Sequence, residues 1–115
     1  AAHEFVAAAG GAVVDEAGYL LHLERMDGAG LPSPEIATLK ARTAAIAKAP
    51  TKVLEDVVKE RPAVGLMPGR LPVQGGVPIL YEGACVGEIG VSGVKSHEDE
   101  IVAIAGREAL LQALA

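Results

Sequence analysis

The sequence predicts an α+β fold in which helices pack on an antiparallel sheet. Two pairs of short apolar runs, within 12–25 and 77–91, are each joined by a turn and have the pattern of a β-hairpin. Stretches with helix signals precede, separate and follow the hairpins, so the expected order is helix, hairpin, two helices, hairpin, helix. Hairpins pair antiparallel, which argues against a doubly wound parallel sheet. The 115 residues are enough for one core, so we predict a single domain over 1–115.

The first predicted helix is a helix end over 1–9 that stops at Gly10-Gly11. The first hairpin then pairs 12–14 with 19–25 across a turn that ends in Gly18. Strict alternation along the second strand places the odd-numbered residues on one face and the even-numbered residues, 20–26, on the other.

The next predicted element is a long helix that begins at Ser33. This residue supplies a hydroxyl cap, Pro34 suits the first turn, and Glu35 lies near the positive end of the helix dipole. The helix is expected to run to about Lys48. Helical spacing turns one stripe inward, made of Ile36, Leu39, Lys40, Thr43 and Ile46.

A shorter helix is predicted over 52–60, with Thr51 as its cap and Pro62 as its end. Residues 64–74 contain several Gly and Pro interruptions. They therefore predict a long loop with room for one short edge strand.

The second hairpin pairs 77–81 with 84–91 across Glu82-Gly83. The last helix is expected from His97 to about Leu114. Ser96 with Asp99 three residues later is similar to a capping box and marks its start.

The stretch GEIGVSGVKSHEDE, residues 87–100, has glycines followed by lysine and serine, as phosphate-binding loops do. It matches neither known pattern, because Val94 separates the last glycine from the lysine and Glu88 interrupts the Rossmann spacing. We predict instead that Gly87 and Gly90 let another segment approach the strand closely, and that Gly93 has a positive φ.

Composition excludes several classes of protein. A net charge of −5 is the wrong sign for a nucleic-acid binder, and no apolar run is long enough to cross a membrane. The three histidines are too scattered for a metal motif, so no metal site is predicted. One cysteine, Cys85, and the lack of a signal peptide predict a cytoplasmic protein, with a removed signal left open. Aromatics make up 3% of the chain, so a flat ligand would lie against aliphatic walls.

Three basic residues are candidates for binding a small anionic ligand. Arg25 ends a predicted strand, Lys40 lies on the inward helix face, and Arg70 follows Pro-Gly in the long loop. If they converge, they form a carboxylate pocket, because Arg, Lys and helix ends are what anionic groups bind. Thr43, one turn from Lys40, and Ser92, at a strand end, complete the predicted ligand-binding set.

Five segments in order give the chain a resemblance to a known family. They are AVVDEAGYLLHLERMDGA (12–29), PSPEIATLKARTAA (32–45), LMPGR (66–70), GGVPILYEGACVGEIGVSG (75–93) and HEDEIVAIAG (97–106). The chain resembles the GlcG/HbpS-type family, which includes the C-terminal domain of PduO-type corrinoid adenosyltransferases. The resemblance implies a profilin-like fold with a five-stranded antiparallel sheet, a longer N-terminal helix of which only the tail appears, and homo-oligomers from dimers to octamers.

The resemblance also implies a function: binding haem or a small molecule, with haem or iron sequestered or degraded. The chemically suitable iron ligands are His22, His97, Met26 and Tyr81. One alternative is a lyase, tautomerase or hydrolase acting on a small carboxylate, with Asp27, Glu88 or His97 moving a proton. Another alternative is a structural or accessory protein that retains no chemistry.

Overall fold

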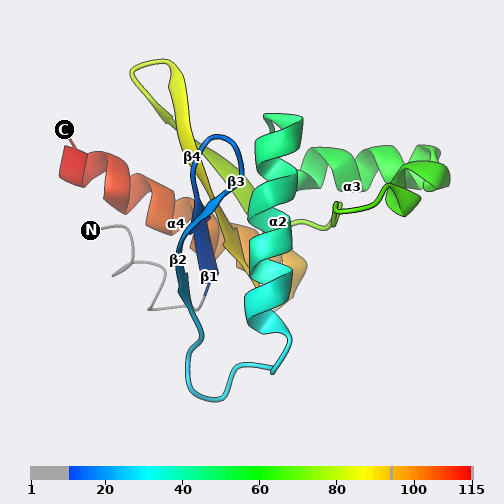
Figure 1. Cartoon of the computed structure of the whole chain (residues 1–115), viewed down its shortest axis with the longest axis horizontal. Coiled ribbons are helices and arrows are strands. Elements are labelled where there is room, and N and C mark those ends of the chain that lie inside the picture. The colour runs from blue at the N-terminus through cyan, green and yellow to red at the C-terminus, as the bar shows by residue number, and fades with distance from the viewer. Residues whose placement is uncertain (1–10, 94, 115) are drawn as a thin grey trace.

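The computed structural model describes residues 11–93 and 95–114. The predicted helix end at 1–9 lies outside these residues. Figure 1 shows the elements in chain order: β1 (Gly11–Val14), β2 (Leu20–Glu24), α2 (Ser33–Ala47), α3 (Thr51–Glu60), the 3-10 helix η1 (Pro62–Leu66), β3 (Gly76–Tyr81), β4 (Ala84–Val91) and α4 (Ser96–Leu114).

The sheet is antiparallel throughout, with the strand order β2-β1-β4-β3. The α+β prediction is therefore confirmed, and both hairpins form as expected. The expected fifth strand is wrong for the described residues, whose sheet has 4 strands. The segment 64–74 forms the end of η1 and a loop, because its prolines lack ladder donors. The profilin-like assignment stays a prediction.

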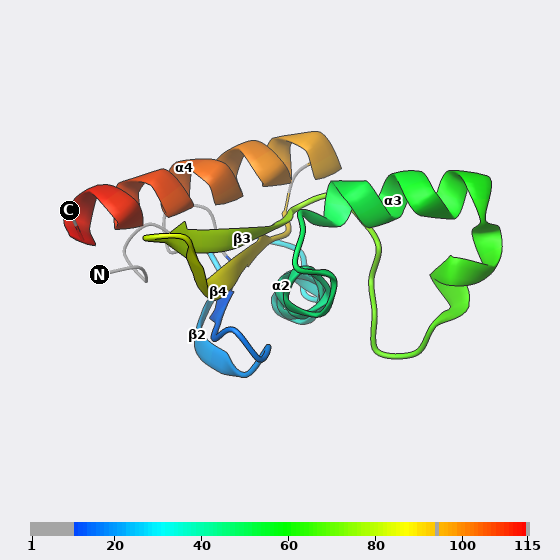
Figure 2. The same ribbon diagram turned by 90° about the horizontal axis from the view of Figure 1, so that it is seen from above.

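Helices cover both faces of the sheet (Figure 2). α4 lies over one face and α2 over the other, so the chain forms three layers. The aliphatic core fills the α4 side. Its buried members are Val13, Val77, Ile79, Ile89, Val91 and Ala103.

α2 packs on its face of the sheet with unusually small side chains. Its buried residues include Ala37, Ala41, Ala44 and Ala45, whereas Ile46 is 52% exposed. The predicted inward stripe is thus wrong for Ile46. The physical reason lies in the sheet: a Cβ on Gly90 would collide with the Ala37 carbonyl oxygen, and one on Gly76 with the Lys40 carbonyl oxygen. The backbone of α2 packs directly against the backbone of the sheet at these glycines. Alanine side chains fit at this contact, whereas a larger side chain such as Ile46 lies away from it.

The predicted close approach at the glycines of β4 is confirmed. Gly90 faces α2, and a Cβ on Gly87 would lie 2.5 Å from the Val14 carbonyl oxygen of β1. Gly93 has a φ of 152°, so its predicted positive φ is also confirmed.

The predicted side-chain caps of α2 and α3 are wrong. Pro32 and Pro50 occupy the N-cap positions, and neither helix has a side-chain cap hydrogen bond. Thr51 instead accepts a hydrogen bond from the Gly76 N–H at 2.9 Å, which ties the start of α3 to β3. Asp99, near the start of α4, has its carboxylate in the interior, where it pairs with Lys40. Its predicted capping role stays a prediction.

β2 is an edge strand with an irregularity that breaks strict alternation. Val13 of β1 pairs with His22, but Val14 pairs with Leu20, so one residue of β2 is extra. Neighbouring residues of β1 point to opposite faces, and so do their partners. Leu20 and His22 therefore lie on opposite faces, which corrects the predicted shared face.

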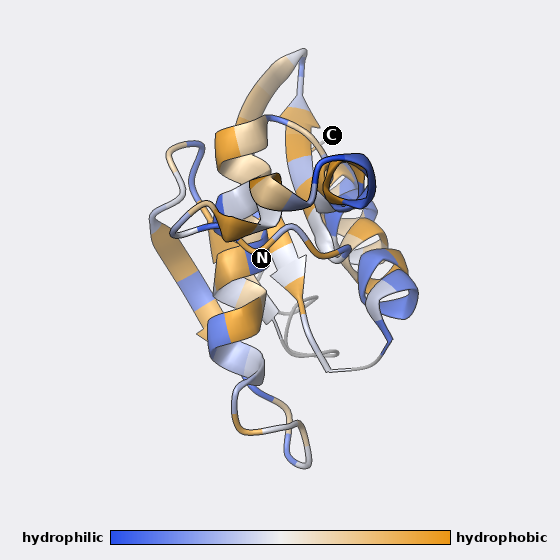
Figure 3. Ribbon diagram, turned by 90° about the vertical axis from the view of Figure 1, so that its right-hand side faces the viewer, coloured by the Kyte–Doolittle hydropathy of each residue, from blue (hydrophilic) through white to orange (hydrophobic). Residues whose placement is uncertain are grey.

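α3 and η1 extend away from the sheet (Figure 1). Thr51 is the buried residue of α3, and Val53 and Val57 are exposed. The helices carry both apolar and charged stretches along their length (Figure 3). Among the described helices, none combines the length and the apolar character that crossing a membrane requires.

Candidate functional site

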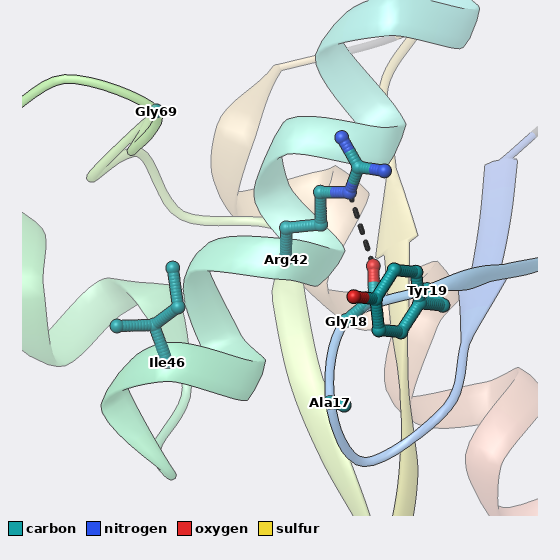
Figure 4. Close-up of a pocket in the computed structure, with 6 residues that line it drawn as sticks. All are labelled: Ala17, Gly18, Tyr19, Arg42, Ile46 and Gly69. Atoms are coloured by element: carbon teal, nitrogen blue, oxygen red, sulfur yellow. Dashed lines mark hydrogen bonds between the residues drawn. The ribbon is translucent and has the colours of Figure 1, made fainter.

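A pocket lies between the β1–β2 turn and α2 (Figure 4). It encloses about 200 Å³. Its lining residues come from three segments: Ala17, Gly18 and Tyr19 from the turn, Arg42 and Ile46 from α2, and Gly69 from the loop after η1. Gly18 has a φ of 90° and Gly69 a φ of 76°. Both are conformations that favour glycine, so these two positions of the pocket wall carry no side chain.

Arg42 is the basic group of this pocket. Its Nε donates a hydrogen bond to the Gly18 carbonyl oxygen at 3.0 Å. This contact anchors the guanidinium at the turn. Its two terminal nitrogens lie on the far side from that carbonyl (Figure 4) and make no hydrogen bond to the described residues. The site therefore contains an oriented guanidinium whose terminal N–H groups can donate hydrogen bonds to a ligand.

The turn opposite Arg42 is held by its own hydrogen bonds. Asp15 Oδ1 accepts from the N–H groups of Ala17 and Tyr19, each at 2.9 Å. Lys48 Nζ donates to the Glu16 carbonyl oxygen at 3.3 Å. The turn that Arg42 contacts is thus held by a carboxylate of its own and by a lysine of the segment after α2.

Thr43 fixes the third wall of the pocket. Its hydroxyl donates to the Leu39 carbonyl oxygen at 2.6 Å and accepts from the Leu71 N–H at 2.8 Å. The loop that carries Gly69 and Arg70 is therefore attached to α2 at this point. This contact gives the predicted ligand-binding residue Thr43 a positioning role.

Lys40 points into the interior rather than into the pocket. Its ammonium lies 2.9 Å from Asp99 Oδ2 and donates to the Val91 carbonyl oxygen at 3.0 Å. Both side chains of the ion pair are almost completely buried. The structure thus joins Lys40 to a carboxylate of α4, and no contact in the described residues joins it to Arg25 or Arg70.

The other predicted ligand-binding residues are dispersed. Arg25 is exposed just after β2, and Arg70 is half-buried and donates to the Pro68 carbonyl oxygen at 3.5 Å. Ser92 is buried at the end of β4. Their roles in binding stay predictions.

Glu88 is a fully buried carboxyl group on β4. Its Oε1 accepts a hydrogen bond from the Cys85 thiol at 3.2 Å, and its Oε2 has no partner among the described residues. Burial raises the pKa of Glu88, although the hydrogen bond from Cys85 acts in the opposite direction. Burial and the hydrogen bond to Glu88 also raise the pKa of Cys85, so this thiol is not activated as a nucleophile.

The predicted iron ligands lie in different places. His22 is half-buried on β2, and its Nε2 lies 2.7 Å from Glu24 Oε1. Met26 is 42% exposed just beyond β2, and His97 is exposed near the start of α4. The Tyr81 hydroxyl donates to the Leu114 carbonyl oxygen at 3.2 Å.

The remaining acid–base candidate, Asp27, is exposed in the loop before α2. No group of three or more acidic, cysteine or histidine side chains within the described ranges could hold a metal ion.

Sequence reasoning missed Arg42. An arginine on an amphipathic helix is solvated by default, and nothing in the spacing of α2 distinguishes it. The sequence feature that could have indicated this site is the turn Asp15-Glu16-Ala17-Gly18, because the carbonyl oxygen of Gly18 accepts the hydrogen bond from Arg42. Only the packing of α2 beside the first hairpin brings the two together.

An antiparallel sheet between two helices, with a basic pocket at a hairpin turn, defines a small α+β domain. More specifically, the chain belongs to the HbpS-like family: the family model described as "Haem degrading protein HbpS-like" matches residues 2–108. This finding confirms the resemblance seen in the sequence.

Individual relatives agree with this family. The chain is 40% identical over 82 residues to Protein GlcG of Escherichia coli (strain K12), a match that covers 70% of this chain and 61% of GlcG. A crystal structure of an HbpS double mutant from Streptomyces reticuli is 38% identical with a TM-score of 0.85, covering 95% of this chain and 81% of that chain. The crystal structure of a PduOC:heme complex is 28% identical with a TM-score of 0.80, covering 94% and 85%.

Proposed function

We propose that this protein binds haem on the surface around β2. Two kinds of support come from its relatives, namely the family description and the solved PduOC:heme complex. The observation that carries the proposal is in the chain itself: β2 presents exposed apolar side chains together with a histidine oriented by a carboxylate.

The apolar part of this surface suits a flat, largely apolar ligand. Leu20, Leu21 and Leu23 are 43%, 65% and 39% exposed, and Tyr19 just before them is 69% exposed. Covering aliphatic side chains contributes about 25 cal/mol per Å² of apolar surface removed from water. Leu20 and Leu23 pair with Val14 and Ala12, so they lie on the face opposite His22, and Leu21 is the extra residue of the edge strand. A haem held by His22 would therefore contact these leucines along the strand edge.

His22 is the iron ligand we propose. A histidine that binds a metal usually hydrogen-bonds through its other ring nitrogen to a carboxylate or carbonyl group, which fixes the ring. Glu24, two residues later on the same strand, provides such a carboxylate at 2.7 Å. Iron in the bound haem would supply the redox chemistry, whereas the chain supplies the ligand, its orientation and the apolar wall.

A hemin titration followed at the Soret band tests this proposal. We expect a saturable shift for the natural protein, its loss in His22→Ala, and affinity weaker by about 10–100-fold in Glu24→Gln. His97→Ala and Met26→Leu are the matched controls and should bind normally. A natural protein without a saturable shift would refute haem binding, and loss of the shift in a control variant would reassign the ligand.

The same samples separate sequestration from degradation. We propose sequestration, because a histidine, its carboxylate and the exposed apolar side chains of β2 suit the holding of a ligand. With ascorbate and air, a sequestered haem keeps its Soret band. Steady bleaching that depends on the protein would instead indicate degradation.

We also propose that the protein forms homo-oligomers through α3 and η1. These elements extend from the sheet and leave Val53, Val57 and Leu66 exposed by 49%, 39% and 85%. Light scattering after gel filtration tests this: Val57→Asp should lower the oligomer mass, whereas Lys59→Asp on the same helix should not. A monomeric natural protein would refute the proposal.

A further inference from the structure

The pocket around Arg42 has features that specify a class of ligand. Its cation is held at one nitrogen and has two terminal nitrogens without a hydrogen-bond partner in the described residues. A guanidinium held in this way presents parallel N–H donors at the spacing of the two oxygens of a carboxylate. An anion with that geometry can bind without displacing an existing contact.

The charge of the pocket suits an anion with one negative charge. Asp15 and Glu16 belong to the turn that Arg42 contacts, and Lys48 donates to the Glu16 carbonyl oxygen. Arg42 is the one charged residue among the described residues that line the pocket, so a single positive charge faces the ligand. A monoanion bound directly to the guanidinium therefore matches the pocket in charge.

The remaining walls are apolar or lack side chains. Ile46 is 52% exposed at the pocket, and Ala17 and Tyr19 of the turn line it across from α2 (Figure 4). At Gly69 a Cβ would meet nothing within 4 Å, so this side of the pocket is open. A volume of about 200 Å³ accommodates a short apolar body next to the carboxylate.

We infer that the Arg42 pocket is a binding site for the carboxylate of a compact apolar acid. Two sources have this chemistry: a propionate side chain of haem, and a free short-chain carboxylic acid. The first source rests on the proposed function. His22 pairs with Val13 of the α4 side and Arg42 belongs to α2 on the other side, so a haem would reach both around the edge strand β2, next to Tyr19. The second source is independent of haem.

The haem source is tested with hemin and its dimethyl ester, in which both propionates are blocked. The natural protein should bind hemin on the order of tenfold more tightly than the ester, as expected for losing a hydrogen bond to a charged group. In Arg42→Gln the two affinities should become equal, and Arg42→Lys should restore part of the difference. Arg61→Gln, an exposed arginine at the end of α3, is the matched control.

The free-acid source is tested with butyrate against butyramide by amide NMR. Butyrate should shift the Gly18, Tyr19 and Gly69 signals and the Arg42 Nε–H signal in a saturable way, and butyramide should not. Arg42→Gln should abolish these shifts while the remaining spectrum shows a folded protein.

The outcomes separate the two proposals. Discrimination between hemin and its ester alone supports the propionate, saturable butyrate shifts alone support a free acid, and both results support both sources. If neither hemin nor its ester binds, the proposed haem function is refuted. The butyrate experiment then still shows whether the Arg42 pocket binds a carboxylate. Equal binding of hemin and ester together with no butyrate shifts overturns the inference.

Discussion

Lys40 and Asp99 form a buried ion pair that connects the helices on the two faces of the sheet. The ammonium of α2 and the carboxylate of α4 are 2.9 Å apart, and the same ammonium donates to the last residue of β4. The pair leaves no room at Gly75, where a Cβ would lie 2.7 Å from Lys40 Nζ. Three layers of the fold therefore meet at one charged contact.

Removing one partner of this pair should destabilise the protein strongly. Lys40→Met leaves the Asp99 carboxylate buried without its cation, which is expected to lower the free energy of unfolding by about 3–5 kcal/mol. The double variant Lys40→Met, Asp99→Leu should lose less than the single variant, because it buries no uncompensated charge. Urea unfolding measures both, and a loss below about 1 kcal/mol for Lys40→Met would contradict this account.

Glu88 should make stability fall as pH rises. The pKa of Glu88 is raised in the folded protein, so the unfolded chain loses this proton at lower pH than the folded chain. The contribution of protonated Glu88 to the free energy of unfolding is therefore complete below the ordinary pKa of 4.5, and it is lost as pH rises through the raised pKa. Glu88→Gln removes this loss. We expect the variant to be more stable than the natural protein at pH 8, and to gain little at pH 4.

Thermal unfolding between pH 4 and pH 8 measures this difference. Glu60→Gln, which removes an exposed carboxylate of α3, controls for the change in net charge. A Glu88→Gln advantage that is the same at every pH would argue against titration of this group.

Gly90→Ala should destabilise the packing of α2. The added Cβ would collide with the Ala37 carbonyl oxygen, and a backbone atom cannot move aside as a flexible side chain can. The expected cost is about 1–3 kcal/mol or more. Gly30→Ala is the matched control, because its Cβ would meet only ordinary contacts, the nearest being Ser33 Oγ at 3.5 Å. Equal melting temperatures for the two variants would show that α2 yields easily.

Thr43→Val should loosen the loop behind the pocket. The substitution keeps the shape and removes the acceptor for the Leu71 N–H, so the loop loses a contact worth about 0.5–1.5 kcal/mol. Hydrogen exchange should become faster at the Leu71 amide. Thr38→Val loses a similar hydroxyl bond to a carbonyl of α2 but holds no loop, and it should leave that amide unchanged. If hydrogen exchange at the Leu71 amide is unchanged in Thr43→Val, Thr43 does not position this loop.

Local signals in the sequence predicted most of the secondary structure. Prolines, turn glycines and alternating apolar runs act over a few residues, so both hairpins and three of the helices were found near their observed positions. The error in α2 has a different origin: apolar periodicity identifies large side chains, but the glycines of the sheet select small ones. Ile46 is therefore exposed while Ala41 is buried.

The site was harder to predict because its contacts join distant parts of the chain. Lys40 and Asp99 are 59 residues apart, and Arg42 and Gly18 are 24 apart. The sequence places Lys40 on an inward helix face, but only the fold shows that α4 supplies its counter-ion. The sequence around Arg42 does not indicate a role in binding, because its contact with the hairpin turn forms only in the folded protein.

The contact between α2 and the glycines of the sheet sets the width of the pocket from a distance. Arg42 and Ile46 are carried by α2, whereas Gly18 and Tyr19 follow β1, and the spacing of these two supports depends on the missing side chains of Gly76 and Gly90. A single methyl group at either glycine would shift the helix and, with it, one wall of the pocket. Ligand preference in this fold is thus sensitive to positions that no ligand touches, and relatives that differ there are expected to differ in the size of molecule they accept.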